Sequence, residues 1–290
     1  ERALRKCPQR IVVLIDDLDR LYPAEVYEMV RIIKAVGDLP NVGYVLAWDE
    51  KFVSAALDKL NVPFAAAYLD KVVQVRLPVP PLSFTQRVAQ MNAGLARLPS
   101  EACETHFPSH ENRIGSVFHH GLSELMEHPR DVVRLFDVLM SIEPNLRGEV
   151  NLGDLMGLAA LMTKAPNVFS LLRSTPQAFV GRRPGTQDSM KKPEEVIDRF
   201  SSDRESAINA CGNPAAVQEL VHWLFPKTAK ADKAFTFDRV VFTEGHLGHP
   251  DRLSVALQMS AGQCDVSLVE VRRVVFQASE REAIAAGLDE

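Results

Sequence analysis

Two adjacent aspartates follow a strongly apolar run near the start of the 290-residue chain. The run covers residues 11–15, IVVLI, and Asp16 and Asp17 come directly after it. Five consecutive apolar residues are typical of a strand that is buried on both faces of a parallel sheet. The two carboxylates are then expected at the carboxyl end of that strand. Because side chains alternate along a strand, the two should point in different directions.

Such a pair has a specific use in the hydrolysis of a nucleoside triphosphate. One carboxylate, that of Asp16, would belong to the shell of a Mg²⁺ ion on the β- and γ-phosphates, and Asp17 would orient the attacking water. The competing interpretation is that the aspartates cap the next helix, as acids after buried strands often do. The longer sequence DDLDR, with a helix and a second strand after it, favours the phosphate chemistry.

Hydrophobic periodicity indicates which elements position these acids. Apolar residues recur at helical spacing over 24–36 until Gly37, and residues 42–48 form a second apolar run. Two strand–helix units in succession predict a parallel sheet. A further helix, a short helix and a third strand, VVQVRL, are expected over residues 52–60, 64–71 and 72–77.

The rest of the chain has a helical pattern. Prolines at 78, 80 and 81 should end the sheet domain near residue 81. Helices are expected beyond it over residues 84–98, 113–127, 129–142 and 152–165. The predicted fold class is therefore α/β, with part of a parallel sheet over 1–81 and an all-helical region over 82–175. A linker or gap over 176–193 and a mostly helical C-terminal region over 194–290 complete the predicted organisation.

Composition restricts the class of protein. With 46% apolar and 24% charged residues, the chain has the composition of a soluble globular protein. Its net charge of −5, without a basic stripe, gives no signal for direct nucleic-acid binding. Four dispersed cysteines indicate neither a zinc site nor a disulfide framework, so a reducing, cytoplasmic setting is expected. No apolar stretch is long enough to predict a membrane span.

Three phrases of the sequence resemble one family in order and spacing. They are RIVVLIDDLDRLYPAEV, LPNVGYVLAWDEKFVSAAL and YLDKVVQVRLPVPP, and they resemble the second half of the KAP P-loop NTPases, a group of STAND-type ATPases. The segments EHPRDVVRLFDVL and EVNLGDLMGLAALMTKAPNVFSLLR extend the resemblance into the helical lid of that family. The resemblance covers about residues 8 to 173 and is faint afterwards.

The resemblance implies specific roles for several residues. ATP and Mg²⁺ would be the ligands, Asp16 would organise the metal ion, and Asp17 would polarise water. Asp19 and Arg20 would complete the acidic signature of the family. Asp49, at the end of the second strand, lies where such ATPases carry a group that senses the γ-phosphate.

Two arginines of the predicted lid are candidates for contacting the nucleotide. Arg130 and Arg134 are four residues apart and so share one face of a helix. A guanidinium group suits phosphate oxygens, and the resemblance makes Arg130 the candidate nucleotide-sensing arginine of the lid. The competing interpretation is two solvated arginines that pair with Glu127 or Asp131.

The third phrase departs from the family at one position. Asp70 stands where the family pattern leads us to expect Glu, beside the basic residue Lys71. The shorter acid puts any role of this pair in doubt. A finger that acts on a neighbouring subunit, at Lys71 or Arg76, is a further hypothesis.

The sequence contains no G-x-x-x-x-G-K-[ST] motif. This loop supplies the lysine and amides that hold the β- and γ-phosphates, and in the family it precedes the acidic strand. The chain is therefore expected to be a C-terminal portion, which should hydrolyse ATP only as part of a complete protein.

The predicted function is that of an ATP-hydrolysing KAP-type ATPase whose nucleotide state drives a conformational or assembly switch. The expected partners are further copies of the same chain, in a ring for example, and an effector protein. Family membership suggests bacterial anti-phage defence as the setting. The alternatives are a non-catalytic nucleotide-binding or oligomeric scaffold module, and membrane-linked signalling.

Overall fold

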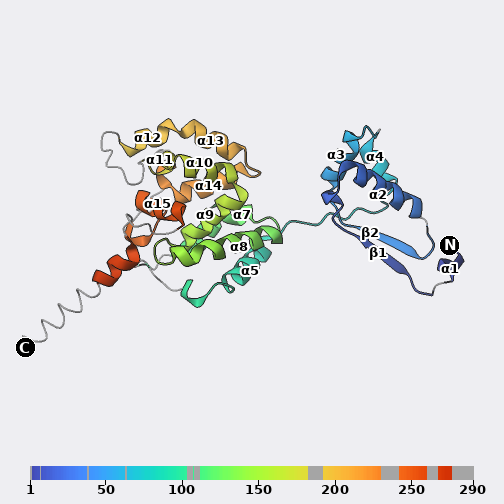
Figure 1. The fold of residues 1–290 in the computed structure, drawn as a ribbon, viewed down its shortest axis with the longest axis horizontal. Coiled ribbons are helices and arrows are strands. Elements are labelled where there is room, and N and C mark those ends of the chain that lie inside the picture. Colours follow the sequence, from blue (N-terminus) through green and yellow to red (C-terminus); the bar gives the residue numbers. More distant parts are fainter. Residues whose placement is uncertain are drawn as a thin grey trace, which may run out of the picture. The chain divides into compact units, whose positions relative to one another are not determined.

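The computed structural model divides the chain into two compact units, Glu1–Pro80 and Pro81–Glu290 (Figure 1). We call them the N-terminal unit and the helical unit. The structure describes residues 2–6, 8–37, 39–62, 64–102, 107, 112–181, 192–229, 242–259 and 267–275.

The N-terminal unit is built on two parallel strands. Strand β1 (Ile11–Ile15) pairs with β2 (Val42–Leu46), in a register that joins Ile11 to Val42 and Ile15 to Leu46. The parallel pairing confirms the prediction from the two strand–helix units. The helical elements of this unit are α1 (Arg2–Arg5), a 3₁₀ turn η1 (Leu18–Arg20), α2 (Pro23–Val36), α3 (Glu50–Lys59) and α4 (Ala65–Asp70).

Helix α2 connects the two strands, and local chemistry sets its start. Pro23 occupies the first helical turn, where its missing N–H group costs nothing. The Glu25 carboxylate accepts a hydrogen bond of 2.9 Å from the Tyr22 amide. Val26, Val30 and Ile33 are buried on one face, with the spacing that predicted the helix. This face contributes to a core shared with α3 and α4.

The sheet is not buried on both faces, so that prediction is wrong for the described structure. Val12 and Leu14 of β1 are 68% and 69% exposed, whereas Val13 and Ile15 between them are partly buried. Helices α2, α3 and α4 all lie on one side of the two strands (Figure 1). The described sheet has two strands, and the exposed Val12 and Leu14 show that one of its faces is open to solvent.

The predicted third strand over 72–77 is also wrong. These residues have no regular structure, and Val75 and Leu77 are 72% and 85% exposed. A strand needs a neighbouring edge to accept its backbone hydrogen bonds, and alternating apolar residues do not supply one. The amide of Val73 instead donates to Leu69 O at 2.9 Å, which extends the end of α4.

The described part of the helical unit contains helices α5 to α15. Among them, α5 (Phe84–Leu95), α8 (Pro129–Leu146) and α9 (Leu152–Lys164) confirm predicted helices within a few residues. The other helices are α6 (Arg113–Val117), α7 (Ser123–Leu125), α10 (Pro166–Ser174), α11 (Gln177–Val180), α12 (Pro193–Arg199), α13 (Ser201–Asn209), α14 (Pro214–Leu224) and α15 (Pro250–Gln258). Most of the linker predicted over 176–193 lies outside the described residues.

The helix predicted over 113–127 is interrupted. A π-helical turn, η3 (Phe118–Leu122), separates α6 from α7, and Gly121 within it has φ of 89°. A Cβ atom at Gly121 would lie 2.2 Å from the carbonyl oxygen of Ala216. The glycine therefore allows this turn to approach α14 closely, which periodicity along the sequence does not reveal.

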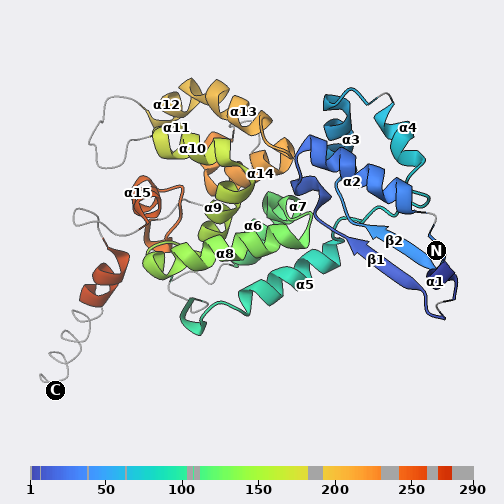
Figure 2. The ribbon, with the colours of Figure 1, turned by 45° about the vertical axis from the view of Figure 1, so that its right-hand side comes forward.

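The core of the helical unit lies around α8 and α9. Helices α5 and α8 run side by side (Figure 2). They approach closely, because a Cβ atom at Gly94 would collide with the Phe136 ring. No described helix is by itself long and apolar enough to cross a membrane. Helices α9 and α10 are long and apolar enough only when they are taken together, and they are bent by 114° from each other. Most of α9 is buried in the core, which explains its apolar composition.

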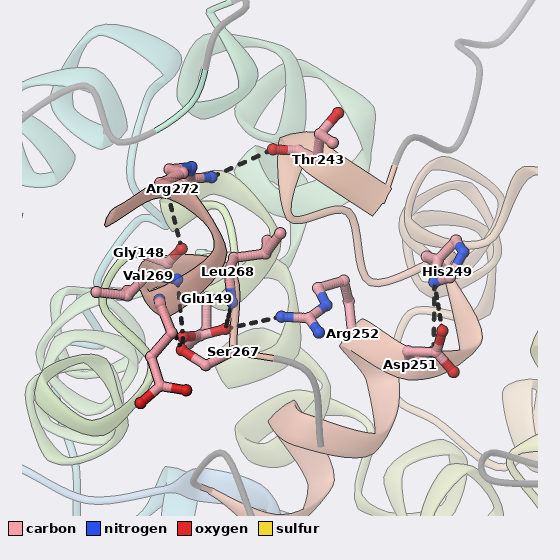
Figure 3. Close-up of polar contacts among 11 residues, drawn as sticks. Gly148, Glu149, Thr243, His249, Asp251, Arg252, Ser267, Leu268, Val269 and Arg272 are labelled. Atoms are coloured by element: carbon pink, nitrogen blue, oxygen red, sulfur yellow. Dashed lines mark hydrogen bonds and ion pairs between the residues drawn. The ribbon is translucent and has the colours of Figure 1, made fainter. Parts of the chain in front are cut away.

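A buried carboxylate attaches the C-terminal residues to this core. Glu149, between α8 and α9, accepts hydrogen bonds from Arg252 Nη1 at 2.7 Å, Ser267 Oγ at 2.6 Å and the Leu268 amide at 2.7 Å (Figure 3). The Val269 amide donates to it as well, at 3.2 Å. Glu149 thus caps the helical residues 268–275 from a distant part of the sequence.

The electrostatics of Glu149 follow from these contacts. Burial by itself raises the pKa of this carboxyl, but the hydrogen bonds from Ser267, Leu268 and Val269 and the charge of Arg252 together lower it below its ordinary value of 4.5. The charged groups near this cluster also include Arg272, which donates to Gly148 O and Thr243 O. The ionised form of Glu149 is therefore the one that stabilises the fold.

We expect Glu149→Gln to lower the free energy of unfolding of the helical unit by roughly 3 to 5 kcal/mol at pH 7, because the buried Arg252 then faces a neutral amide in place of the carboxylate 2.7 Å away. Since the pKa of Glu149 is lower in the folded state, its contribution is present above pH 4.5 and is lost as the pH falls below it. Urea unfolding at pH 7 and pH 4 measures both effects. The exposed Glu124→Gln is the control, and equal losses in the two variants would contradict the assignment.

Candidate functional site

The parallel register places the two predicted acidic positions at the same edge of the sheet. Strands β1 and β2 end at the paired residues Ile15 and Leu46, and the Ala47 amide donates to Ile15 O at 2.9 Å. Asp16 follows β1 directly, and Asp49 comes three residues after the end of β2. The structure therefore places the acids of both strands at the carboxyl edge, where open α/β sheets bind ligands.

Asp16 and Asp17 form a tight turn at the end of β1. The Asp17 amide donates to Asp16 Oδ1 at 2.8 Å. Asp17 itself has φ of 59° and ψ of 28°, a left-handed conformation that Asp tolerates better than most residues. Leu18, which is 1% exposed, anchors the next turn of the chain.

Neither aspartate caps the following helix. Asp17 makes no capping hydrogen bond with its side chain, and the first turn of α2 is completed by Tyr22 and Glu25 instead. The competing interpretation from the sequence is therefore wrong. Both carboxylates are exposed, and Asp17 Oδ1 lies 3.0 Å from Arg20 Nε in a solvent-accessible ion pair.

Asp49 has a structural role that the sequence analysis missed. Its Oδ1 atom accepts hydrogen bonds from the amides of Lys51 at 2.8 Å and Phe52 at 3.2 Å, so it is the N-cap of α3. An aspartate directly before a helical pattern was the available signal. Its role as a sensor of the γ-phosphate stays a prediction.

A three-residue ion-pair cluster lies beside this edge. Arg76 donates from Nη1 to Glu50 Oε1 at 2.6 Å, and its Nη2 lies 2.7 Å from Asp70 Oδ1. Glu50 is the first residue of α3, next to Asp49. Asp70, which stands where the family pattern has Glu, thus pairs with Arg76 and not with the adjacent Lys71. Sequence reasoning could not find this cluster, because its members are 26 and 6 residues apart without a periodic relation.

The two predicted lid arginines lie on α8 in the helical unit. Both are exposed, and neither forms an ion pair with a residue of the described ranges. Asp131, the suggested partner, accepts from the His128 amide at 2.9 Å and lies 2.9 Å from Lys164 Nζ. Pairing of Arg130 or Arg134 with Asp131 is therefore wrong. The structure gathers Asp16, Asp17 and Asp49 in one unit and places the two arginines in the other.

Among the residues that the structure describes, no group of three or more His, Cys, Asp or Glu side chains is arranged to hold a metal ion. The carboxyl edge offers individual carboxylates instead. Mg²⁺ in phosphate-binding sites commonly takes one or two protein carboxylates, with phosphates and waters as its other ligands. The donor chemistry at the edge is consistent with that kind of partial site.

A strand–helix–strand unit with acids at the carboxyl edge of parallel strands defines the class of α/β nucleotide-binding domains. Within that class, the chain belongs to the KAP family, whose P-loop domain matches residues 1–146.

A relative supports this placement. The phage T7 exclusion protein of Escherichia coli (strain K12) is 26% identical to the chain over 168 residues, which are 55% of this chain and 22% of that protein. The chain thus spans about a fifth of the length of this relative. No solved structure matches the chain.

The capping role of Asp49 leads to a stability prediction. Asp49→Ala removes the acceptor of the Lys51 and Phe52 amides and should cost about 1 kcal/mol of local stability at the start of α3. Hydrogen exchange at these two amides should accelerate about fivefold. Asp49→Asn keeps an acceptor oxygen and should leave exchange nearly unchanged. Equal acceleration in both variants would show that charge, not capping, stabilises this turn.

Proposed function

We propose that this chain supplies the catalytic acids and the lid of an ATP-hydrolysing KAP protein whose nucleotide state drives a conformational or assembly switch. The observation that carries the proposal is the position of Asp16 and Asp17, exposed at the carboxyl edge of a parallel strand and not used as helix caps. Membership of the KAP family supports nucleotide binding.

Asp17 is the proposed water-orienting acid. Its ion pair with Arg20 is half-exposed, and such pairs contribute only about 0 to 1 kcal/mol. Such a weak pair leaves the Asp17 carboxylate available to a reacting water. The left-handed backbone fixes where the side chain leaves the turn. A positioned carboxylate that accepts a proton from water is the general-base arrangement required for phosphoryl transfer to water.

Asp16 is the proposed Mg²⁺ residue, directly or through a water molecule. Its Oδ1 atom accepts a hydrogen bond from the Asp17 amide, which restrains the carboxylate and leaves Oδ2 available to a ligand. The ion would neutralise developing charge on the phosphates. Asp49, at the neighbouring strand end, is the proposed group near the γ-phosphate.

Arg130 and Arg134 are the proposed nucleotide contacts of the helical lid. They project from α8, whose buried face packs in the core of the helical unit, so their backbone positions are rigid while their guanidinium groups remain exposed. Two exposed arginines one helical turn apart and without an acidic partner among the described residues suit a polyphosphate.

The biological setting is proposed from the relative. Because that protein is named for phage T7 exclusion, we propose a role in bacterial anti-phage defence. The proposal includes ATP and Mg²⁺ as ligands, a cytoplasmic location, self-association and an effector protein as the recipient of the switch.

Asp17→Asn in the full-length protein should retain ATP binding and lower turnover by about 100-fold or more, because it removes the proton acceptor. Asn also tolerates the left-handed conformation, so the turn should persist. Phosphate release and equilibrium nucleotide binding measure the two effects. The control is Asp58→Asn, an exposed aspartate near the far end of α3. Turnover that is absent in the wild type, or unchanged in Asp17→Asn, would favour the non-catalytic scaffold.

Arg130→Gln should lower turnover by about 100-fold, the usual cost of removing one donor that stabilises transition-state charge. Arg134→Gln tests the second arginine in the same assay. Arg173→Gln, an exposed arginine in the last turn of α10, is the matched control. If all three variants behave alike, α8 does not contact the nucleotide.

A further inference from the structure

A connecting segment, residues 73–83, joins the N-terminal unit to the helical unit. It lies between the end of α4 and the start of α5 and has no regular secondary structure. Leu77 and Val79 within it are 85% and 89% exposed. The segment is nevertheless attached to each unit at a defined residue.

The first attachment is Arg76. Its two terminal nitrogens bind acids from two different helices, Glu50 at the start of α3 and Asp70 at the end of α4, at 2.6 and 2.7 Å. A planar guanidinium group with two separate partners has a defined orientation, which a single flexible ion pair lacks. Because Glu50 is adjacent to Asp49, this attachment lies next to the carboxyl edge of the sheet.

The second attachment is Leu82, in the helical unit. Its amide donates to Glu127 O at 2.8 Å, and its carbonyl oxygen accepts from Arg87 Nε at 3.0 Å. Arg87 also donates to Ser123 O at 2.9 Å, and a capping box of Ser83 and Gln86 fixes the start of α5. The position of Leu82 is therefore determined by α5 and by residues 123–127.

The residues between the attachments are rich in proline. Positions 77–81 have the sequence LPVPP, with prolines at 78, 80 and 81. Proline fixes φ and restricts the residue before it, so such a sequence favours an extended polyproline conformation of about 3.1 Å per residue. The connecting segment therefore has few backbone conformations open to it.

We infer that Arg76 is a positioning residue that holds the connecting segment at the carboxyl edge, so that nucleotide bound at this edge controls release of the segment. The inference rests on the proposed function, because nucleotide at Asp49 is what would shift Glu50. Both ion pairs are partly exposed, with side-chain exposures between 38% and 65%, so they are weak enough to exchange. A strong buried pair would fix the segment in one state.

The attachment itself is tested without nucleotide. Elastase cleaves after small aliphatic residues, and Val75 is exposed beside the attachment. In the full-length protein, Glu50→Gln combined with Asp70→Asn should accelerate cleavage after Val75 about fivefold, because proteolysis follows the population of the released segment. These changes leave the sequence around the cleavage site intact. Glu28→Gln, which removes the comparably exposed pair with Arg31, is the control. Equal rates in the double variant and the wild type would overturn the attachment.

The coupling is tested by repeating the cleavage with and without Mg²⁺ and ATP, alongside phosphate release. We expect nucleotide to change the cleavage rate in the wild type and in Glu28→Gln, and the double variant to lose this difference while still binding ATP. A retained difference would overturn the coupling and leave the ATPase proposal standing. A wild type that neither binds nor hydrolyses ATP would overturn both, and the nucleotide-free rates would still decide whether Arg76 holds the segment.

Discussion

The parallel pairing of β1 and β2 is the constraint on which the site depends. Its register joins Ile15 to Leu46, and the hydrogen bond from the Ala47 amide to Ile15 O continues the pairing past the last paired residues. Parallel strands end at the same edge, so the residues that follow them meet there whatever their separation in sequence. A slip by one residue would move Asp16 to the other face of the sheet. Helix α2 connects the two strands, and its buried face packs with α3 and α4.

The two units use electrostatic interactions in different ways. At the carboxyl edge, the pairs of Arg20 with Asp17 and of Arg76 with Glu50 are exposed to solvent and weak. In the helical unit, Arg113 and Asp154 are 2.6 Å apart and almost fully buried, and breaking such a pair costs about 3 to 5 kcal/mol. The weak, exposed ion pairs therefore lie at the edge where a ligand is expected to compete for them. The strong, buried ion pair lies between helices of the core, whose positions it fixes.

Sequence reasoning succeeded where local pattern determines structure. The strand at residues 11–15, helix α2 and the start of α8 follow from apolar spacing and from proline at the first helical turn. It failed where a partner decides the outcome: residues 72–77 alternate like a strand but have no described edge to join. The cluster around Glu149 was missed for the same reason, since Arg252 and Ser267 are more than one hundred residues away from it in the chain. Such contacts leave no periodic signal.

The open face of the sheet affects how firmly the acids are positioned. Val12, Leu14 and Val45 are at least half exposed, so only the face toward α2, α3 and α4 contributes burial. Two strands alone are marginally stable in water, and the buried cluster formed by these helices must therefore support the strand ends. A ligand that binds only the folded edge stabilises it by mass action. The stabilisation grows with the logarithm of the ratio of the ligand concentration to the dissociation constant. Ligand binding and the stability of the carboxyl edge are then linked. Under the proposed function, a nucleotide at Asp16, Asp17 and Asp49 would stabilise both strand ends and the start of α3, where Glu50 binds Arg76 of the connecting segment.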